Sequence, residues 1–371
     1  MSFASHRPCK PHRLVFSKSL LGWLTLLLGC SLCLGSPRAW AQDATGKKGT
    51  EKKDAENTDS DKKTEKEDEK DEPEPPEPED LKLTTEDGLE LRGKVFPNAK
   101  ANEETIPVIL LHGFKGSGKD FTQGDGLAAF LQKQKKFRCT VIVPDLRGHG
   151  ESTQIKVGKK FEKVDPKKLK PSDVGLMLTQ DLGAVKDYLW EQNNKRKLNI
   201  DKTVVIGVEE GAALALSYAA WDAQGYEQQQ AKVGPLKLGL FVKGVVLISP
   251  KTNVIGLNTM KIVKMPVQAP ICSFLPVMIV AGNQKPANPY LKDAEQIRTI
   301  FVIARPPADN AKPQSMTVWS FKIGTQLQGT KLLAEPSLKV PEKIALFMKA
   351  RLVTNDDAKD WGWKPRKLPH E

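Results

Sequence analysis

Histidines are few in this chain, and their positions limit the hydrolytic chemistry that it can perform. The 371 residues contain five histidines. His6, His12 and His370 lie close to the two ends of the sequence, whereas His112 and His149 lie in glycine-containing, turn-like segments. A serine or aspartate nucleophile of a hydrolase needs an imidazole to accept a proton and to activate water. No histidine is well placed for that task unless the C-terminal segment brings His370 back to the fold.

Two carboxylates occupy the junction between a strand-like run and a helix-like run. The apolar segment 203–206 is followed by Gly207-Val208-Glu209-Glu210-Gly211, and the small residues that continue to Ala220 suit a helix packed closely on a sheet. A carboxylate in the first turn of a helix is stabilised by the macrodipole and by free backbone N–H groups, typically by about 0.3–1 kcal/mol. We therefore expect the helix macrodipole and nearby backbone N–H groups to stabilise the carboxylate of Glu209.

Metal and phosphate sites find no support in the sequence. The chain has five cysteines, three of which precede residue 42, and it contains no spaced pair of ligands typical of a metal site. Cys139 and Cys272 flank apolar runs, which favours buried free thiols over a functional pair. Gly116-Ser117-Gly118-Lys119 lacks the glycine spacing of a phosphate-binding loop. We expect no metal and no cofactor.

The elements that position these residues alternate between strands and helices. Short apolar runs bounded by turn residues indicate strands buried on both faces of a parallel sheet. A stripe formed by Leu178, Leu182, Val185 and Leu189 predicts an amphipathic helix between two of them. The predicted strands are 107–111, 139–143, 203–206, 242–248 and 276–280. This order predicts an α/β fold with a doubly wound, mostly parallel sheet flanked by helices.

Three turns follow predicted strands and carry the most specific signal. They are Leu111-His112-Gly113-Phe114, Pro144-Asp145-Leu146-Arg147-Gly148-His149-Gly150-Glu151-Ser152 and Gly207-Val208-Glu209-Glu210-Gly211. In this order and spacing they resemble the α/β-hydrolase fold family, in particular its branch of monoglyceride lipases and serine aminopeptidases. The resemblance covers roughly residues 81–352 and implies about eight strands with little or no cap domain.

The resemblance also implies that the catalytic triad is replaced. In this family Gly-x-Ser-x-Gly is the nucleophile elbow, and here Gly207 and Gly211 flank Glu209 instead of a serine. The family's acid position corresponds to Lys285, and its histidine position corresponds to Gln328. Relatives that use an aspartate nucleophile still need a histidine to hydrolyse the ester, so Glu209 is a weak candidate for that role. Glu209 is instead expected to fill the vacated oxyanion region, to pair with Lys285 or to accept a hydrogen bond from Gln328.

The remaining motif residues are assigned to backbone geometry. The resemblance implies that the oxyanion donors are the backbone N–H groups of Phe114 and Glu210. We expect His112 and Arg147 to stabilise turns rather than to act in catalysis. The other turn residues of these motifs are Gly113, Asp145, Gly148, His149 and Gly150.

The ends of the chain differ in character from its centre. Residues 1–41 combine basic residues, an apolar run from Leu20 to Leu34 and the tripeptide Ala39-Trp40-Ala41, which is typical of a secretory signal cleaved after Ala41. A retained membrane anchor is one alternative, and a lipoprotein site at Cys30 is a weaker one, because the apolar run continues past that cysteine. Residues 42–80 are charged and rich in proline and are expected to form a disordered linker. The folded domain is expected over 81–355, followed by a basic tail over 356–371.

Charge is divided unevenly along the sequence. The formal net charge is +12, but residues 42–80 carry −8 and residues 81–371 carry +15. The segment 156–170 contains seven lysines against Glu162 and Asp165, and its default interpretation is a solvated surface insertion. Aromatic residues interleave poorly with these lysines, so no nucleic acid is expected as a partner. Membrane contact is expected only through an uncleaved signal, if at all.

These observations predict an exported protein of the cell envelope, secreted or periplasmic. We expect a catalytically inactive pseudohydrolase that acts as a binding or scaffold protein. The sequence does not identify its partner, and an anionic partner is one of the options. One alternative is an active esterase or peptidase with a displaced catalytic residue set. The other is a binder of an anionic polymer through the basic surface of the domain.

Overall fold

The computed structural model describes residues 73–233, 240–264, 269–284, 289–305 and 317–366. All of them belong to one of the two compact units of the chain, Glu69–Glu371. Within these ranges no helix has the length and apolar character needed to cross a membrane. The signal and most of the linker expected from the sequence lie outside the described residues.

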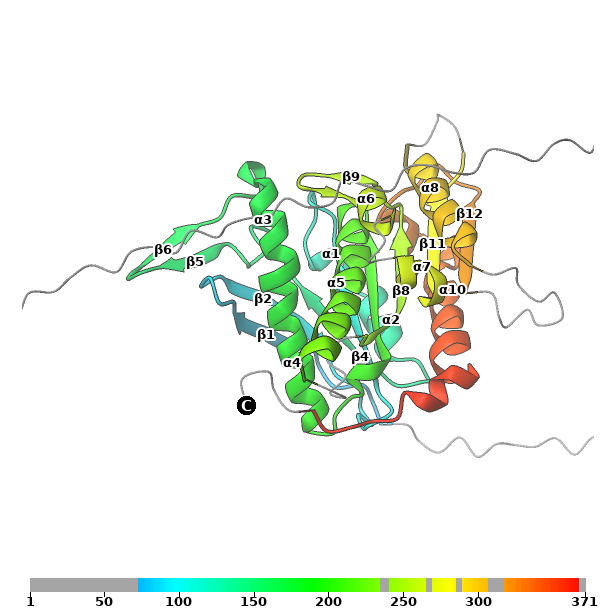
Figure 1. The fold of residues 1–371 in the computed structure, drawn as a ribbon, viewed down its shortest axis with the longest axis horizontal. Helices are drawn as coiled ribbons and strands as arrows, with labels where there is room; N and C mark the ends of the chain where they lie inside the picture. The colour runs from blue at the N-terminus through cyan, green and yellow to red at the C-terminus, as the bar shows by residue number, and fades with distance from the viewer. Residues whose placement is uncertain (1–72, 234–239, 265–268, 285–288, 306–316, 367–371) are drawn as a thin grey trace, which may run out of the picture. The chain divides into compact units, whose positions relative to one another are not determined.

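One eight-stranded sheet organises this unit, in the order β1-β2-β4-β3-β7-β8-β11-β12 (Figure 1). β1 and β2 form an antiparallel hairpin, and β2 also pairs antiparallel with β4. The six remaining strands run parallel to one another. Their bounds are β1 Glu79–Thr84, β2 Glu90–Phe96, β3 Ile106–Leu111, β4 Cys139–Pro144, β7 Thr203–Val208, β8 Val242–Ile248, β11 Val277–Gly282 and β12 Val318–Ile323. The doubly wound, mostly parallel sheet predicted from the sequence is confirmed, and so are its five predicted strands.

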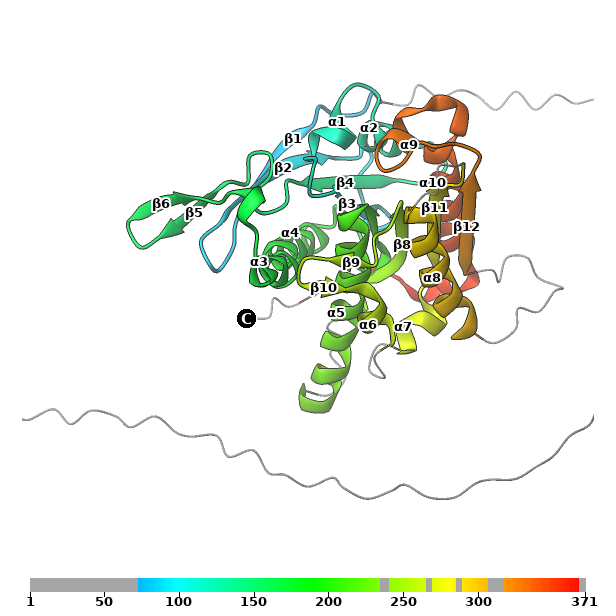
Figure 2. The same cartoon turned by 90° about the horizontal axis from the view of Figure 1, so that it is seen from above.

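Helices cover both faces of the sheet (Figure 2). On one face lie α3 Pro171–Leu176, α4 Leu182–Asn194, α5 Glu210–Val233, α6 Thr259–Lys264, α7 Ala269–Phe274 and α8 Pro289–Ile303. On the other lie α1 Lys119–Thr122, α2 Leu127–Gln132, α9 Lys331–Ala334 and α10 Val340–Met348. The side chains of each central strand alternate between two apolar clusters, for example Ile109 and Val205 in one cluster and Leu110 and Ile206 in the other. This alternation explains why the strands read as continuous apolar runs.

Short elements complete the fold. Between β8 and β11 the described chain adds the hairpin of β9 Asn253–Val254 and β10 Leu257–Asn258, together with α6 and α7. A second hairpin follows β4 in the sequence and consists of β5 Gln154–Val157 and β6 Lys160–Lys163. Cys139 and Cys272 are buried free thiols, as the sequence predicts.

Residues on both sides of the range 81–355 form hydrogen bonds with the folded domain. The sheet begins at Glu79, and the buried side chain of Gln132 donates hydrogen bonds to the carbonyl groups of Pro76 and Pro97. At the other end, the Trp363 indole donates to the carbonyl of Asn193, and the Asn199 amide donates to the carbonyl of Trp361. The packed region therefore extends beyond residues 81–355 in both directions, because backbone carbonyls outside that range bond to buried polar side chains.

Candidate functional site

The carboxyl edge of the parallel strands collects the residues that the sequence singles out. β3 leads into Phe114, β7 leads into Glu209 and β12 leads toward Gln328. Parallel strands place their carboxyl ends at one edge of a sheet, where ligands of doubly wound folds bind. The elements therefore bring together residues that lie 95 or more positions apart in the chain.

Glu209 occupies a strained turn between β7 and α5. Its φ angle is +53°, in the left-handed region that a residue with a side chain adopts rarely. The flanking glycines are required by contact: a Cβ at Gly207 would lie 2.2 Å from the carbonyl oxygen of Gly211, and a Cβ at Gly211 would lie 2.2 Å from that of Leu111. The backbone thus has the sharp strand-to-helix geometry of a nucleophile elbow, with a glutamate at its apex.

The neighbouring carboxylate, Glu210, holds the first expected oxyanion donor. The backbone N–H of Phe114 donates to Glu210 Oε2 over 3.1 Å. The same Oε2 lies 3.0 Å from the position that a Cβ would take on Gly113. The carboxylate expected in this region was that of Glu209, but the carboxylate that bonds to the Phe114 N–H is that of Glu210.

Lys251, which follows β8, forms an ion pair with the Glu210 carboxylate. Its Nζ lies 2.5 Å from Glu210 Oε1 and 3.7 Å from Glu209 Oε2. Burial by itself raises the pKa of Glu210, but the bonds from Lys251 and Phe114 outweigh it, so the pKa lies below the ordinary 4.5. Burial likewise lowers the pKa of Lys251, and Glu210 more than reverses this. Both groups are therefore charged at neutral pH.

The sequence motifs did not single out Lys251. One signal was present, because Lys251 stands three residues after the apolar run that ends at Ile248, at the same edge of the sheet as Glu209. The segment after this strand carries no recognisable motif, so nothing in the sequence distinguished Lys251 from the many other lysines.

Gln328 makes its hydrogen bonds away from Glu209. Ser249 Oγ donates to Gln328 Oε1 over 2.8 Å, and Gln328 Nε2 donates to the Gly282 carbonyl over 3.4 Å. Gly329 N–H donates to Ser249 Oγ, also over 2.8 Å. Because its amide is engaged in this way, Gln328 is not the partner expected for Glu209. Lys285, the other expected partner, lies outside the described residues.

Ser249 is a second strained residue at this edge. It is fully buried, and its φ angle is +48°. Its N–H donates to the Val280 carbonyl over 2.8 Å. The hydroxyl therefore links the end of β8 to the loop after β12.

The turn after β4 is held by Asp145 and His112. The Asp145 carboxylate accepts hydrogen bonds from the N–H groups of Gly118 (2.7 Å) and Glu151 (2.9 Å), and Gly150, with φ +50°, leaves space for it. His112 Nε2 accepts from the Leu146 N–H, so Nδ1 carries the proton that faces the Gly113 carbonyl at 2.7 Å. Burial lowers the pKa of His112 to about 4, and the ring is neutral at pH 7.

Arg147 and His149 extend the same network. The Arg147 guanidinium, 2 % exposed, bonds to both Asp87 (2.6 and 3.0 Å) and Asp181 (2.6 and 3.3 Å). His149 places Nδ1 3.0 Å from the Arg147 carbonyl and Nε2 2.9 Å from the Phe114 carbonyl. Gly148 has φ +81°, and a Cβ there would contact Val164 and Pro166. These contacts stabilise the turns that follow β3 and β4.

Comparison with known proteins agrees with this geometry. A family model described as alpha/beta hydrolase fold matches residues 106–221, from β3 through the first half of α5. The DcsB protein, solved in complex with a substrate analogue, is 13% identical, with a TM-score of 0.50 over 74% of this chain and 100% of that one. The chain has the α/β-hydrolase fold.

Other solved structures are similar at lower scores. An esterase of Pyrococcus furiosus is 19% identical, with a TM-score of 0.46 over 74% of this chain and 90% of that one. An esterase of Pyrobaculum calidifontis is 15% identical, with a TM-score of 0.47 over 76% and 87%. No curated protein sequence matches the chain.

Within the α/β-hydrolase fold, the described residues offer no imidazole for catalysis. Both ring nitrogens of His112 and both of His149 face backbone groups. In the described ranges, no cluster of three or more histidine, cysteine, aspartate or glutamate side chains is arranged to hold a metal ion. The arrangement therefore presents a charged, hydrogen-bonded cluster of Glu209, Glu210 and Lys251, whose side chains are 13–23% exposed, at the position of a hydrolase active site.

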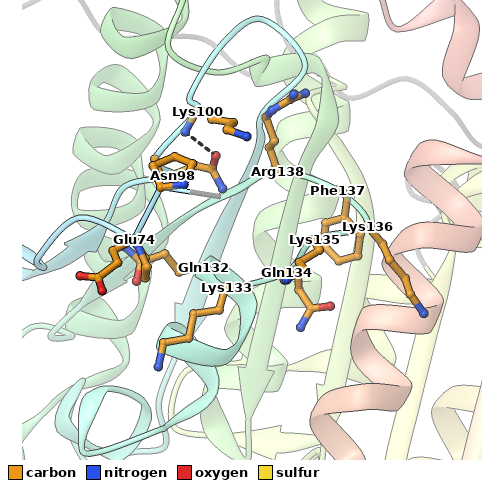
Figure 3. Close-up of a pocket in the computed structure, with 13 residues that line it drawn as sticks. Glu74, Asn98, Lys100, Gln132, Lys133, Gln134, Lys135, Lys136, Phe137 and Arg138 are labelled. Atoms are coloured by element: carbon orange, nitrogen blue, oxygen red, sulfur yellow. Dashed lines mark hydrogen bonds between the residues drawn. The ribbon is translucent and has the colours of Figure 1, made fainter. Parts of the chain in front are cut away.

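A cavity of about 500 Å³ lies at the other edge of the sheet (Figure 3). It is lined by the segments that precede β3 and β4, including Lys100, Lys133, Lys136 and Arg138, and by the segment 73–75. It is remote from the elbow, since the amino ends of parallel strands face away from their carboxyl ends. This cationic hollow is thus separate from the candidate site.

Proposed function

We propose that this protein is a catalytically inactive member of the hydrolase fold that acts as a binding or scaffold protein at the cell envelope. The observation that carries the proposal is the hydrogen bond from the Phe114 N–H to the Glu210 carboxylate. Within the fold, the three turn motifs favour descent from the branch of monoglyceride lipases and serine aminopeptidases.

The carboxylate opposes acyl-transfer chemistry in two ways. An oxyanion hole accelerates such reactions by offering unpaired N–H donors where negative charge develops. Here Glu210 Oε2 already occupies one donor, and its negative charge would repel a developing oxyanion. Lys251 keeps the carboxylate ionised, so the donor stays occupied at neutral pH.

The nucleophile position supports the same proposal. Glu209 at the apex of the turn would form an ester only if a base then activated water to hydrolyse it. The two histidines of the described ranges are committed to backbone groups. Ser152 and Ser217 are structural as well, since Ser152 Oγ accepts from the Arg92 N–H and Ser217 Oγ donates to the Ala213 carbonyl.

A turnover assay tests the proposal. The purified protein is incubated with a panel of short-chain aryl esters and aminoacyl arylamides, beside an esterase as positive control. We expect rates no higher than those of variants that carry Glu209→Gln or Ser249→Ala. Turnover that one of these substitutions abolishes, with unfolding curves unchanged, would contradict inactivity.

The alternative of an active esterase rests on one observation, the strained turn at Ser249. A serine with positive φ after a strand, bonded to the residue at the histidine position, has the placement of a displaced nucleophile. Its hydroxyl, however, donates to an amide oxygen, which is a poor base, and it is fully buried. The Ser249→Ala variant in the assay above separates the two functions.

Export is part of the proposal. The signal-like residues 1–41 support a secreted or periplasmic location, and N-terminal sequencing of the protein isolated from its source tests it. We expect the first residue to be Gln42. An intact N-terminus in a membrane fraction would support the retained anchor instead.

A further inference from the structure

A lysine-rich arm projects from the sheet at the edge that bears the candidate site. The arm comprises residues 154–170, which include the β5–β6 hairpin and a 3-10 turn at Pro166–Lys168. It follows the carboxyl end of β4, and the hairpin extends away from the sheet in both views (Figures 1 and 2). Neither the hydrogen-bonded cluster nor the proposed function accounts for it.

The base of the arm is fixed by backbone contacts. The Lys156 N–H donates to the Gly88 carbonyl over 2.8 Å, and the Val164 N–H donates to the Thr153 carbonyl over 2.8 Å. Arg147 ties the β1–β2 turn, through Asp87, to the start of α4. The hairpin is therefore held in one direction by the fold.

Two apolar side chains near the far end of the hairpin are exposed. Val157 is 51% exposed and Phe161 is 54% exposed, although both are apolar. A two-residue turn of Gly158, at φ +62°, and Lys159 joins their strands. Phe161 pairs with Lys156 across the hairpin, and Val157 pairs with Lys160. Because directly paired residues point to the same face, Val157 and Phe161 lie on opposite faces of the hairpin, each beside its paired lysine. Neither side chain belongs to the two apolar clusters of the fold.

The lysines of the arm are exposed and carry a net positive charge. They are Lys156, Lys159, Lys160, Lys163, Lys167, Lys168 and Lys170. Among the described residues, none of them is ion-paired with an acidic side chain. The nearest acids in sequence are Glu162 and Asp165, and Asp165 is used to cap the Lys167 N–H. The arm thus carries seven lysines and two acids, a formal net charge of +5.

We propose that the arm docks on the surface of an anionic lipid bilayer. Lysines near an anionic membrane are attracted to its headgroups, and apolar side chains gain free energy at the boundary with the acyl chains. A soluble acidic polymer would engage the lysines but would give Phe161 and Val157 nothing to be buried in. The exposed apolar side chain on each face of the hairpin therefore favours lipid over polymer as the partner.

The docking would set the orientation of the molecule. The hairpin extends past β1 and β2 (Figures 1 and 2), so docking would turn this side of the sheet toward the bilayer. This contact would not require residues 1–41, which are expected to be removed. It is also independent of catalysis, so it can fail without affecting the proposed inactivity.

Vesicle binding tests the inference. The purified protein is sedimented with vesicles of phosphatidylcholine alone and with vesicles that also contain phosphatidylglycerol. We expect binding only to the anionic vesicles. Substituting Lys159, Lys160 and Lys163 by Gln should weaken binding at least tenfold, since each lysine near the surface contributes a several-fold factor in affinity. Phe161→Ser combined with Val157→Ser should weaken it several-fold at unchanged charge.

A matched control uses lysines at the opposite edge of the sheet. Substituting Lys100, Lys133 and Lys136 by Gln removes the same charge from an equally exposed surface, and we expect vesicle binding to stay within twofold of wild type. Equal losses in the two triple variants would show non-specific attraction and overturn the proposal.

Two further outcomes decide between lipid and polymer. In protein that begins at Gln42, Phe161→Cys labelled with an environment-sensitive dye should shift its emission to the blue on anionic vesicles. The two other cysteines of that protein, Cys139 and Cys272, are buried, so the new thiol is the reactive one. If the dye does not respond and the serine double variant binds normally, while soluble polyphosphate competes, the arm binds an acidic polymer and the lipid assignment is wrong.

Discussion

The carboxylate of Glu210 accepts a hydrogen bond from the backbone N–H of Phe114, 96 residues away in the chain. The two residues sit at the ends of different parallel strands, where a working hydrolase would leave this donor free for its substrate. Lys251 completes the group by pairing with the same carboxylate. The N–H group expected to be an oxyanion donor is thus bonded to one of the protein's own carboxylates.

Removing the Glu210 carboxylate should destabilise the fold. Glu210→Ala leaves the Phe114 N–H and the Lys251 ammonium without their partner, with an expected loss of about 1–3 kcal/mol in the free energy of unfolding. Glu210→Gln keeps an acceptor and should lose less. Urea unfolding measures both. Glu191→Gln, which removes a carboxylate from an exposed ion pair, should stay within about 0.5 kcal/mol of wild type.

The elbow glycines should tolerate no side chain. In Gly211→Ala, the new Cβ would lie 2.2 Å from the Leu111 carbonyl oxygen, so helix α5 would have to move from the sheet. We expect a loss of about 3 kcal/mol or more, or failure to accumulate as folded protein. Gly183→Ala in α4 meets nothing within 4 Å and should instead stabilise the protein by about 0.5–1 kcal/mol. Equal effects of the two substitutions would contradict the packing described for the elbow.

Arg147 should matter for stability rather than for chemistry. Its guanidinium bonds to Asp87 and Asp181, and Asp181 is 1% exposed. Arg147→Met leaves a buried carboxylate unpaired, which typically costs about 3–5 kcal/mol. Arg147→Lys cannot form the forked contact and should recover only part of this. A melting temperature unchanged in Arg147→Met would contradict this role.

The stability of the fold should depend on pH through His112. Burial holds the pKa of His112 at about 4, below the 6.5 of an exposed imidazole, so the unfolded chain takes up a proton between these values while the folded chain does not. Stability contributed by the neutral ring is fully present above pH 6.5 and is lost as the pH falls toward 4. His112→Gln keeps an acceptor for the Leu146 N–H and should flatten this part of the profile, as measured by urea unfolding from pH 7.5 to 4. If the free energy of unfolding falls as steeply with pH in the variant as in wild type, groups other than His112 cause the pH dependence.

The sequence predicted the central sheet well because its strands are buried on both faces. Each such strand is a continuous apolar run, for example Val204 to Ile206. Strand β12 was missed because it lies at the edge of the sheet, where Ser320 and Lys322 interrupt the apolar pattern. A half-exposed strand has a weaker signal than a buried one.

The site was predicted in its position but not in its contacts. The glycine spacing located the elbow, and the resemblance located Phe114 and Gln328. Which of two adjacent glutamates would reach Phe114 depends on the backbone at Glu209, which has a positive φ angle. The Glu209 carboxylate lies between Gly329 and Gly113, with Oε1 beside the first and Oε2 beside the second. Lys251 was missed because its role depends on a distance across strands, and no spacing in the sequence records that distance.

Active-site labelling tests the central claim most directly. The purified protein is exposed to an excess of a fluorophosphonate and its intact mass is measured. The closed oxyanion region and the absence of a catalytic imidazole among the described residues predict that the mass stays unchanged while an esterase control is fully modified. A stoichiometric adduct on the native protein, lost in Ser249→Ala and absent after unfolding, would show that a working nucleophile survives and that the site is an active one.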